Sequence, residues 1–410
     1  MGSIHEQGTA VQKRAEIRLE ALTGLRFLAA AHVLFFHAGL AGLPGVPVWI
    51  KNVAAHADLS VSLFFVLSGF ILTYNYFDPV RGCRTSDREF WVARFARVYP
   101  VYLLGLVLAI PLLLNDLAQE DGTPLVTKIA AIVLVVVLLQ SWLPQTAWLW
   151  NFPAWSLSDE AFFYWAFPGT ARRLRGLRQS QIIIAMAAVW LVAQAPPVIA
   201  QVLGPDGVAV IPESAMSTVM RGVQMNPLLR LPDFVIGILL GRFYLLYISR
   251  EQQEQLPLRR LGPVFSIGGL ALSIAAVAVS PEYPFPLTWS RSLLAPLNAM
   301  LIFGLALGGG FLWKLLNTRA LVLLGNASYA LYLLHIPVIF WTLLAARSWF
   351  GVQSPECWEM FAAYVIVAVG VSILAFLVVE EPMRHLLRQL IIRRLRARAG
   401  TEHQTVAARN

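Results

Sequence analysis

Arg26 and His37 are the two residues of this 410-residue chain whose types and spacing point most directly to chemistry. They lie eleven residues apart in the apolar stretch Leu22-Thr-Gly-Leu-Arg-Phe-Leu-Ala-Ala-Ala-His-Val-Leu-Phe-Phe-His37. At about 100° per residue this separation is nearly three helical turns, which places both side chains on one face, with His37 roughly 16 Å farther along the axis. The pattern predicts a guanidinium that binds an anion below an imidazole that takes a proton.

The composition indicates that this helix lies in a membrane. Hydrophobic residues make up 58% of the chain, charged residues 13%, and the mean hydropathy is +0.64. A soluble protein of this size carries more charge, and the long apolar runs lack the alternation of membrane β-strands. Ionisable groups are costly inside a membrane helix and therefore suggest function. Eleven apolar segments are expected, at about 21–41, 58–77, 98–114, 127–143, 153–168, 181–203, 232–249, 262–280, 291–312, 321–344 and 358–379.

The positive charges give the expected orientation of these segments. The net charge of +9 is interpreted as lysine and arginine collected in cytoplasmic loops rather than as a nucleic-acid site. Both chain ends are then cytoplasmic, and the protein is expected in the cell membrane. The terminal basic residues are Lys13, Arg14 and Arg18 at the start, and Arg384, Arg388, Arg393, Arg394, Arg396 and Arg398 at the end.

The number of crossings follows from this orientation. Between the cytoplasmic arginines Arg97 and Arg172 the chain must cross an even number of times, yet three apolar segments lie there. The shortest, 153–168, is the preferred candidate for a re-entrant segment, which membranes tolerate only where it lines a protein cavity. We therefore predict an all-α polytopic bundle of about ten transmembrane helices plus one re-entrant segment. Its parts are a cytoplasmic tail (1–20), a transmembrane domain (21–384) and a basic cytoplasmic tail (385–410).

A second pair of arginines, Arg94 and Arg97, is spaced to share a helix face at the inner membrane surface. Guanidinium groups bind phosphate oxygens through two parallel hydrogen bonds. The pair is therefore a candidate site for the phosphates of a nucleotide-containing donor. Ordinary positive charge flanking a membrane helix is the alternative.

Glu160 lies inside the aromatic run Trp155-Ser-Leu-Ser-Asp-Glu160-Ala-Phe-Phe-Tyr164. A carboxylate in such surroundings needs a partner. We expect Glu160 to pair with an arginine or to orient an imidazole by accepting its N–H. A purely structural ion pair is the alternative.

Two further blocks contain candidate residues. Ser68-Gly69 follows a run of bulky residues, and since no base lies near Ser68 in sequence, the pair is interpreted as a place where helices pack closely. His335 lies in a late apolar segment, about as far from the cytoplasmic end as His37. Two imidazoles at equal depth would line one cavity if their helices touch.

Taken together, these blocks resemble the membrane-bound acyltransferase family 3, whose members are integral-membrane acyltransferases. The resemblance spans about residues 20–388. It departs from the common pattern at Thr23 and Ser62, where many members have Asp, and at Ala161, where a second Glu is common. The matching residues are Leu22, Gly24, Leu25, Arg26, Ala29, Ala30, His37, Val61, Leu63 to Phe70, Arg94, Arg97, Trp155 to Ser158, Glu160, Phe163, Tyr164, Pro168, Ser328, Tyr329, Tyr332 to His335, Glu380, Pro382 and Arg384.

The resemblance implies transfer of an acyl group, most often acetyl, from acyl-coenzyme A to a hydroxyl of a sugar, glycan or glycosylated natural product. On this hypothesis Arg94 and Arg97, with Arg26, hold the donor's phosphates. His37 is the catalytic base or, less favoured, an acyl carrier, and Glu160 orients a cation or imidazole. No metal is expected, because no zinc-type spacing is present. The residues expected to line the substrate cavity are His335, Tyr332, Trp155 and Ser158.

Two other classes of function fit part of the pattern. A proton-coupled transporter also places ionisable residues and broken helices around a central site, and it predicts inverted repeats and uptake without coenzyme A. A non-catalytic membrane sensor predicts no turnover and tolerance of the loss of His37.

Overall fold

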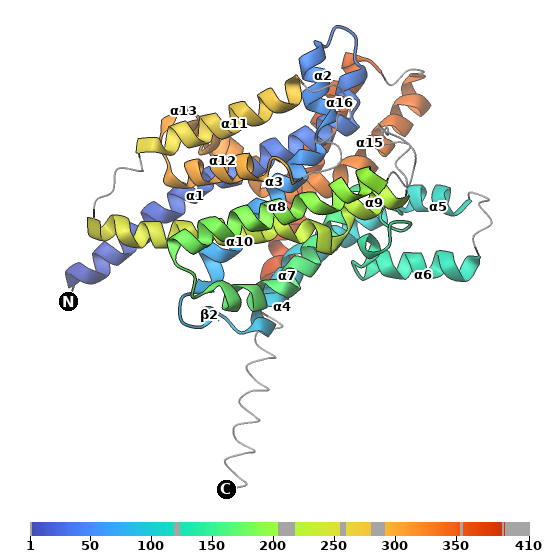
Figure 1. The fold of residues 1–410 in the computed structure, drawn as a ribbon. Helices are drawn as coiled ribbons and strands as arrows, with labels where there is room; N and C mark the ends of the chain where they lie inside the picture. Colours follow the sequence, from blue (N-terminus) through green and yellow to red (C-terminus); the bar gives the residue numbers. More distant parts are fainter. Residues whose placement is uncertain are drawn as a thin grey trace.

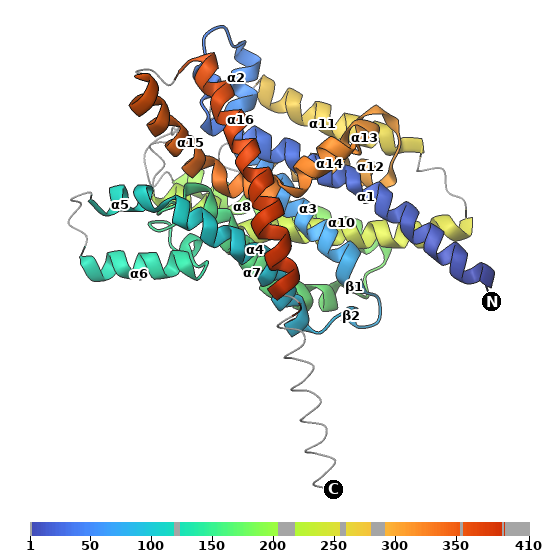
Figure 2. The same cartoon turned by 180° about the vertical axis from the view of Figure 1, so that it is seen from behind.

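The computed structural model describes residues 2–118, 124–203, 218–254, 260–279, 292–352, 356–387 and 389, without the side chains of 2–18, 201 and 250–254. This part of the chain is a bundle of α-helices with one short β-hairpin (Figures 1 and 2). Most of the basic C-terminal tail lies outside the described residues. The elements are α1 (Gly2–His37), η1 (Leu40–Gly42), α2 (Val48–Ala55), α3 (Asp58–Tyr76), β1 (Phe77–Asp78), β2 (Gly82–Cys83), α4 (Asp87–Leu108), α5 (Ile110–Ala118), α6 (Leu125–Val136), η2 (Gln140–Trp142), η3 (Phe152–Ala154), α7 (Trp155–Leu174), α8 (Gln179–Leu203), α9 (Thr218–Met225), α10 (Pro227–Glu254), α11 (Gly262–Ala278), α12 (Ala295–Leu307), α13 (Gly310–Leu316), α14 (Arg319–Asn326), α15 (Ser328–Phe350), α16 (Trp358–Ala375) and the π-helical turn η6 (Phe376–Glu380).

Several helices are long and apolar enough to cross a membrane, so the predicted all-α, multi-pass architecture is confirmed. Among the described residues there are 7 such helices, or 8 if one bent pair forms a single span, and the expected count of about ten is not confirmed. The helices α6 and α11 are apolar but shorter. The seven spans are Leu19–His37, Asp58–Tyr76, Asp87–Leu108, Gln179–Ala200, Thr218–Ser249, Ser328–Phe350 and Trp358–Leu387.

The bent pair is α12 and α13, whose axes differ by 81°. Gly308 and Gly309 form the bend at φ values of 84° and 91°, which side chains with a Cβ rarely adopt. The segment predicted to be re-entrant, 153–168, begins in the short turn η3 and continues in the 20-residue helix α7, which is not among the seven candidate spans of the described residues. An irregular but well-defined stretch, 137–154, precedes α7 and packs inside the bundle.

Helices α3 and α10 pack closely at the centre of the bundle. A Cβ added to Gly69 would lie 2.2 Å from the carbonyl oxygen of Phe234, and one added to Gly237 would lie 2.0 Å from that of Val66. Only glycine permits this approach of the two backbones. The interpretation of Ser68-Gly69 as a close-packing site is therefore confirmed for Gly69, whereas Ser68 lines a cavity and donates a hydrogen bond to Glu160.

The start of α4 is fixed by its own sequence. The Ser86 hydroxyl accepts a hydrogen bond from the Glu89 backbone N–H, and the Glu89 carboxylate accepts one from the Ser86 N–H, which forms a capping box. Asp87 at the first helical position binds both terminal nitrogens of Arg172, at 2.7 and 3.0 Å. These contacts tie the beginning of α4 to the end of α7 and so set the two helices antiparallel at the site.

The glycine contact between α3 and α10 gives a stability prediction. Gly237→Ala is expected to lower the free energy of unfolding by about 1–3 kcal/mol, the usual cost of overpacking, because the added methyl meets the Val66 carbonyl. Gly370→Ala in α16 is the control, since nothing lies within 4 Å of a Cβ there. Thermal unfolding of the detergent-solubilised protein, followed by size-exclusion chromatography, measures both. Equal stability of the two variants would contradict the packing.

Candidate active site

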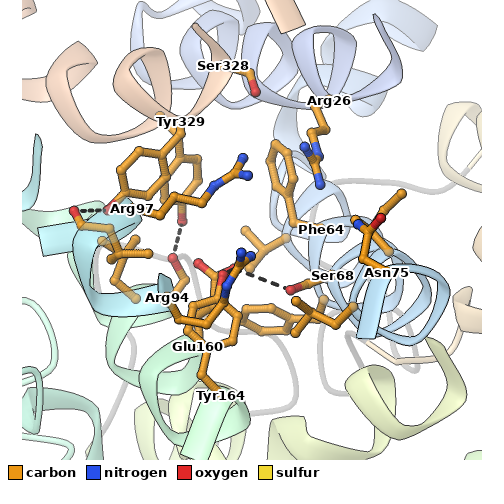
Figure 3. A pocket seen from close by; sticks show the side chains of 18 of the residues that line it. Arg26, Phe64, Ser68, Asn75, Arg94, Arg97, Glu160, Tyr164, Ser328 and Tyr329 are labelled. Atoms are coloured by element: carbon orange, nitrogen blue, oxygen red, sulfur yellow. Dashed lines mark hydrogen bonds between the residues drawn. The ribbon is translucent and has the colours of Figure 1, made fainter. Parts of the chain in front are cut away.

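A cavity of about 390 Å³ lies between α1, α3, α4, α7 and α15 (Figure 3). Three arginines line it, together with one carboxylate and several hydroxyl groups, so the lining has a net positive charge. The polar lining residues are Arg26, Ser68, Asn75, Tyr76, Arg94, Arg97, Ser156, Glu160, Tyr164, Ser328, Tyr329 and Tyr332.

The three predicted donor-binding arginines converge on this cavity. Arg26 enters from α1, Arg94 and Arg97 enter from α4, and Figure 3 shows their guanidinium groups directed toward its middle. Arg94 Nη2 donates to the Tyr76 hydroxyl at 2.9 Å, while its buried Nε has no hydrogen-bond partner among the described residues. Within that part of the chain none of the three lies within ion-pair distance of a carboxylate. The cavity therefore offers unmatched positive charge to a ligand.

Glu160 is the carboxylate of the cavity, and its partners are hydroxyl groups. It accepts hydrogen bonds from Ser68, at 3.3 Å, and from Tyr164, one turn farther along α7. It makes no direct ion pair with an arginine and no contact with an imidazole among the described residues, so both partners expected from the sequence were wrong. Arg26 is near enough only for a longer-range electrostatic interaction.

The neighbouring carboxylate belongs to another face of α7. Asp159 is fully buried and accepts a hydrogen bond from the Ser141 hydroxyl at 2.7 Å.

The described residues contain no group of three or more His, Cys, Asp or Glu side chains placed to hold a metal ion.

Tyr332 and Ser156 form one end of the cavity. Their hydroxyls lie 2.8 Å apart, and the Tyr332 hydroxyl also donates to the Pro153 carbonyl at 3.2 Å. The Phe64 ring packs edge-on against Tyr332. This polar contact joins α15 to the start of α7.

Two histidines meet next to Tyr332. His335 lies one turn beyond Tyr332 on α15, and its Nε2 is 3.1 Å from His37 Nδ1. The His335 side chain is 1% exposed, and its ring centre is 6.1 Å from that of Tyr332. Neither histidine is among the residues that line the cavity. The structure thus brings the two predicted imidazoles together, with Tyr332 between His335 and the arginine-lined space.

Backbone carbonyls hold the other contacts of the two rings. His37 Nδ1 is 3.0 Å from the Val33 carbonyl oxygen, while His335 Nδ1 is 2.8 and 3.2 Å from those of Tyr332 and Leu331. His37 Nε2 is buried with no hydrogen-bond partner among the described residues. Phe152 packs edge-on against His37. These contacts fix the pair in place and leave His37 Nε2 as a buried ring nitrogen without a hydrogen-bond partner among the described residues.

Three of the four expected cavity residues do not line the cavity: His335, described above, and the α7 residues Trp155 and Ser158. Trp155 packs against Phe65 in the hydrophobic core, and Ser158 is buried where its hydroxyl accepts from the Ser141 N–H at 3.4 Å. Helical periodicity explains both errors, because Ser156, Glu160 and Tyr164 share the face of α7 toward the cavity. Residues 155, 158 and 159 face away from it.

The sequence analysis also missed tyrosines that line the cavity. Tyr164 binds Glu160, Tyr76 binds Arg94, and Tyr329 donates to the Val98 carbonyl at 2.8 Å. The four-residue spacing from Glu160 to Tyr164 is a helical-neighbour signal that points to the first of these. Tyr76 and Tyr329 join the site through tertiary contacts, which no sequence spacing reveals.

Comparison with known proteins decides the family. The profile of the acyltransferase domain (Acyl_transf_3) matches residues 19–380, which include Arg26, the histidine pair and the cavity. The chain belongs to the acyltransferase 3 family. It is therefore a membrane enzyme that transfers acyl groups other than aminoacyl groups, as the sequence blocks predicted.

Its curated relatives include proteins named as acyltransferases and a protein named for exopolysaccharide production. Acyltransferase MdmB of Streptomyces mycarofaciens is 29% identical over 384 residues, which cover 90% of this chain and 93% of the relative. Exopolysaccharide production protein ExoZ of Rhizobium meliloti is 26% identical, over 83% of this chain and 91% of the relative. Peptidoglycan O-acetyltransferase OatA of Listeria monocytogenes is 24% identical, and 89% of this chain matches 55% of that protein. No solved structure matches.

The cavity itself predicts a pattern of chemical access. In a chain whose Cys83 and Cys357 are replaced by serine, Ser68→Cys should react with a charged, water-soluble thiol reagent, because Ser68 lines the cavity. Ser62→Cys, on the same helix, should stay unmodified because Ser62 is 0% exposed. Mass spectrometry of the intact protein measures the modification. Equal labelling of both cysteines would show that the cavity is closed to water or wrongly placed.

Proposed function

We propose that this protein is an integral-membrane O-acyltransferase that moves an acyl group, in the simplest case acetyl, from acyl-coenzyme A to a carbohydrate hydroxyl. The observation that carries the proposal is the arrangement of three arginines in one cavity, none of them in an ion pair among the described residues, near a buried pair of imidazoles. The first feature suits a polyanionic donor, and the second suits proton transfer at the reacting hydroxyl.

The donor's phosphates are assigned to Arg26, Arg94 and Arg97. Guanidinium groups bind phosphate oxygens through charge-assisted hydrogen bonds, which strengthen where water is scarce. Both chain termini are cytoplasmic in this proposal, so the donor enters from the cytoplasm. Its long flexible arm then points from the arginines toward Tyr332 and brings the thioester to the histidines.

The chemical step is a direct transfer assisted by His37. His37 Nε2 takes the proton of the acceptor hydroxyl as that oxygen attacks the thioester carbonyl carbon. The carbon–sulfur bond breaks, the ester forms, and the proton passes to the departing thiolate to give free coenzyme A. The hydrogen-bonded hydroxyls of Ser156 and Tyr332 line the cavity, and Tyr332 contacts His335, so we assign the path of the thioester carbonyl group to this contact.

Carbohydrate is the acceptor class best supported by the relatives. The name of OatA refers to peptidoglycan, and the name of ExoZ refers to exopolysaccharide. Both polymers present many sugar hydroxyls, so we assign a hydroxyl of a sugar, glycan or glycoside to this enzyme. A proton-coupled transporter, by contrast, would move solute without consuming coenzyme A.

Loss of the proposed base tests this mechanism. His37→Ala is expected to lower kcat for acetyl transfer by about 10²–10⁴-fold, the usual contribution of a positioned general base. Binding of acetyl-coenzyme A should stay near normal, because the arginines are untouched. Turnover by the purified variant is measured alongside donor affinity. Turnover close to wild type at equal protein amounts would rule out the base role.

The donor site is tested through two arginines of α4. Arg94→Ala is expected to weaken acetyl-coenzyme A binding by roughly tenfold or more, because a hydrogen bond to a charged group contributes about 1.5–3 kcal/mol. Arg88→Ala is the matched control, since Arg88 is exposed on the same helix and lies outside the cavity. Isothermal titration gives both dissociation constants. An equal effect of the two substitutions would mean that net charge alone, not the cavity, attracts the donor.

A further inference from the structure

The hydrogen bonds of the histidine pair assign a proton to each ring. A carbonyl oxygen only accepts hydrogen bonds, so His335 Nδ1, at 2.8 Å from the Tyr332 carbonyl, must carry a hydrogen. In a neutral imidazole the other nitrogen then has the lone pair. His335 Nε2 is therefore an acceptor, and it faces His37 Nδ1 at 3.1 Å.

The assignment continues into His37. Its Nδ1 lies between two acceptors, the Val33 carbonyl oxygen at 3.0 Å and His335 Nε2 at 3.1 Å. Both contacts are satisfied only if this nitrogen carries the hydrogen. His37 Nε2 then has the lone pair, and this atom is the buried one without a hydrogen-bond partner among the described residues.

We propose that His335 is a positioning residue, which holds His37 in the tautomer whose Nε2 accepts the proton of the acceptor hydroxyl. The inference rests on the proposed function. It assigns to His335 the orientation of the imidazole, a role that the sequence analysis predicted for Glu160. Glu160 contacts Ser68 and Tyr164 instead, and the histidine pair lies beyond Tyr332.

His335 itself is locked in the required state. The carbonyl oxygens of Leu331 and Tyr332 both lie next to its Nδ1, and the side chain is 1% exposed, so its ring cannot turn without leaving a buried donor unpaired. Its Nε2 is already engaged by His37, so His335 has no free nitrogen to act as the base. It accepts a hydrogen bond from the base and does not exchange a proton with the substrate.

The arrangement also supports the charged state of His37 during the reaction. When Nε2 takes the hydroxyl proton, the positive charge spreads over the ring, and the hydrogen bond from Nδ1 becomes charge-assisted. His335 Nε2 and the Val33 carbonyl both receive this bond. As the thiolate leaves, the proton passes from Nε2 to sulfur, and the pair returns to its starting protonation.

Substitution of His335 by glutamine or by asparagine distinguishes a role in positioning His37 from a role in packing alone. In His335→Gln the side-chain oxygen reaches about as far as Nε2 and can accept from His37, whereas in His335→Asn the amide is one methylene shorter. The asparagine amide can still donate to the α15 carbonyls but does not reach His37. The two variants therefore carry the same polar group and differ in whether it can accept the hydrogen bond from His37.

We expect His335→Asn to lower kcat about 10–100-fold, the effect of losing about 1.5–3 kcal/mol from a charge-assisted hydrogen bond. The KM for acetyl-coenzyme A and the unfolding temperature should change little, and His335→Gln should regain most of kcat. Because the two histidines act as a unit, adding His335→Asn to His37→Ala should cause no further loss.

Equal kcat in the glutamine and asparagine variants would overturn the positioning role, as would losses of kcat that follow the unfolding temperature alone. If His335→Asn does not fold, its unfolding transition will show this, and His335→Gln then provides the test. A folded His335→Gln variant with kcat below one hundredth of wild type also overturns the positioning role. If His37→Ala itself retains turnover, the proposed base role of His37 fails independently of His335, whereas a wild-type protein that transfers no acetyl group contradicts the proposed function itself.

Discussion

Three guanidinium groups in one cavity, inside a bundle that spans lipid, form the constraint on which the rest of this structure depends. Moving each charge out of water costs several kcal/mol, and like charges repel more strongly where the dielectric constant is low. Glu160 and the buried Glu380, which interacts electrostatically with Arg97 and Arg26, offset only part of this charge. An anionic ligand would complete the compensation. This unbalanced charge is the reason we propose that the cavity holds a donor with several phosphates.

The packing of the helices fixes where the charged side chains lie around the cavity. The capping box at Ser86 and the Asp87–Arg172 pair fix α4 against α7, so that Arg94, Arg97 and Glu160 meet from opposite sides. The close approach of α3 and α10 at their glycines supports the same wall. On α1, roughly 16 Å separates Arg26 from His37. The proposed anion site and the proposed proton-transfer site are therefore distinct places, and Tyr332, which lines the cavity, contacts His335.

Many of the residues of the candidate site could be predicted from local sequence. The predictions that were wrong have physical causes. Arg26, Arg94 and Arg97 were found because helical spacing fixes the face on which each arginine lies, and His335 because depth can be counted along a span. The spacing did not show that Arg26 would line the cavity while His37 lies behind Tyr332. Trp155 and Ser158 were misplaced because a short motif does not reveal which side of α7 faces the cavity. The partners of Glu160, the glycine bend at Gly308 and the contact between the two histidines depend on tertiary packing between segments far apart in sequence.

The central claim is that the arginine cavity and the histidine pair together move an acyl group from coenzyme A to a sugar hydroxyl. The most direct test uses the purified protein in lipid nanodiscs with acetyl-coenzyme A labelled in its acetyl group, and with oligosaccharides from peptidoglycan and exopolysaccharide as acceptors. The account predicts label on the sugar as an alkali-labile ester, with one free coenzyme A thiol released for each ester formed. Labelled sugar ester formed without release of that thiol, or no ester with any carbohydrate acceptor while the protein binds acetyl-coenzyme A, would contradict it.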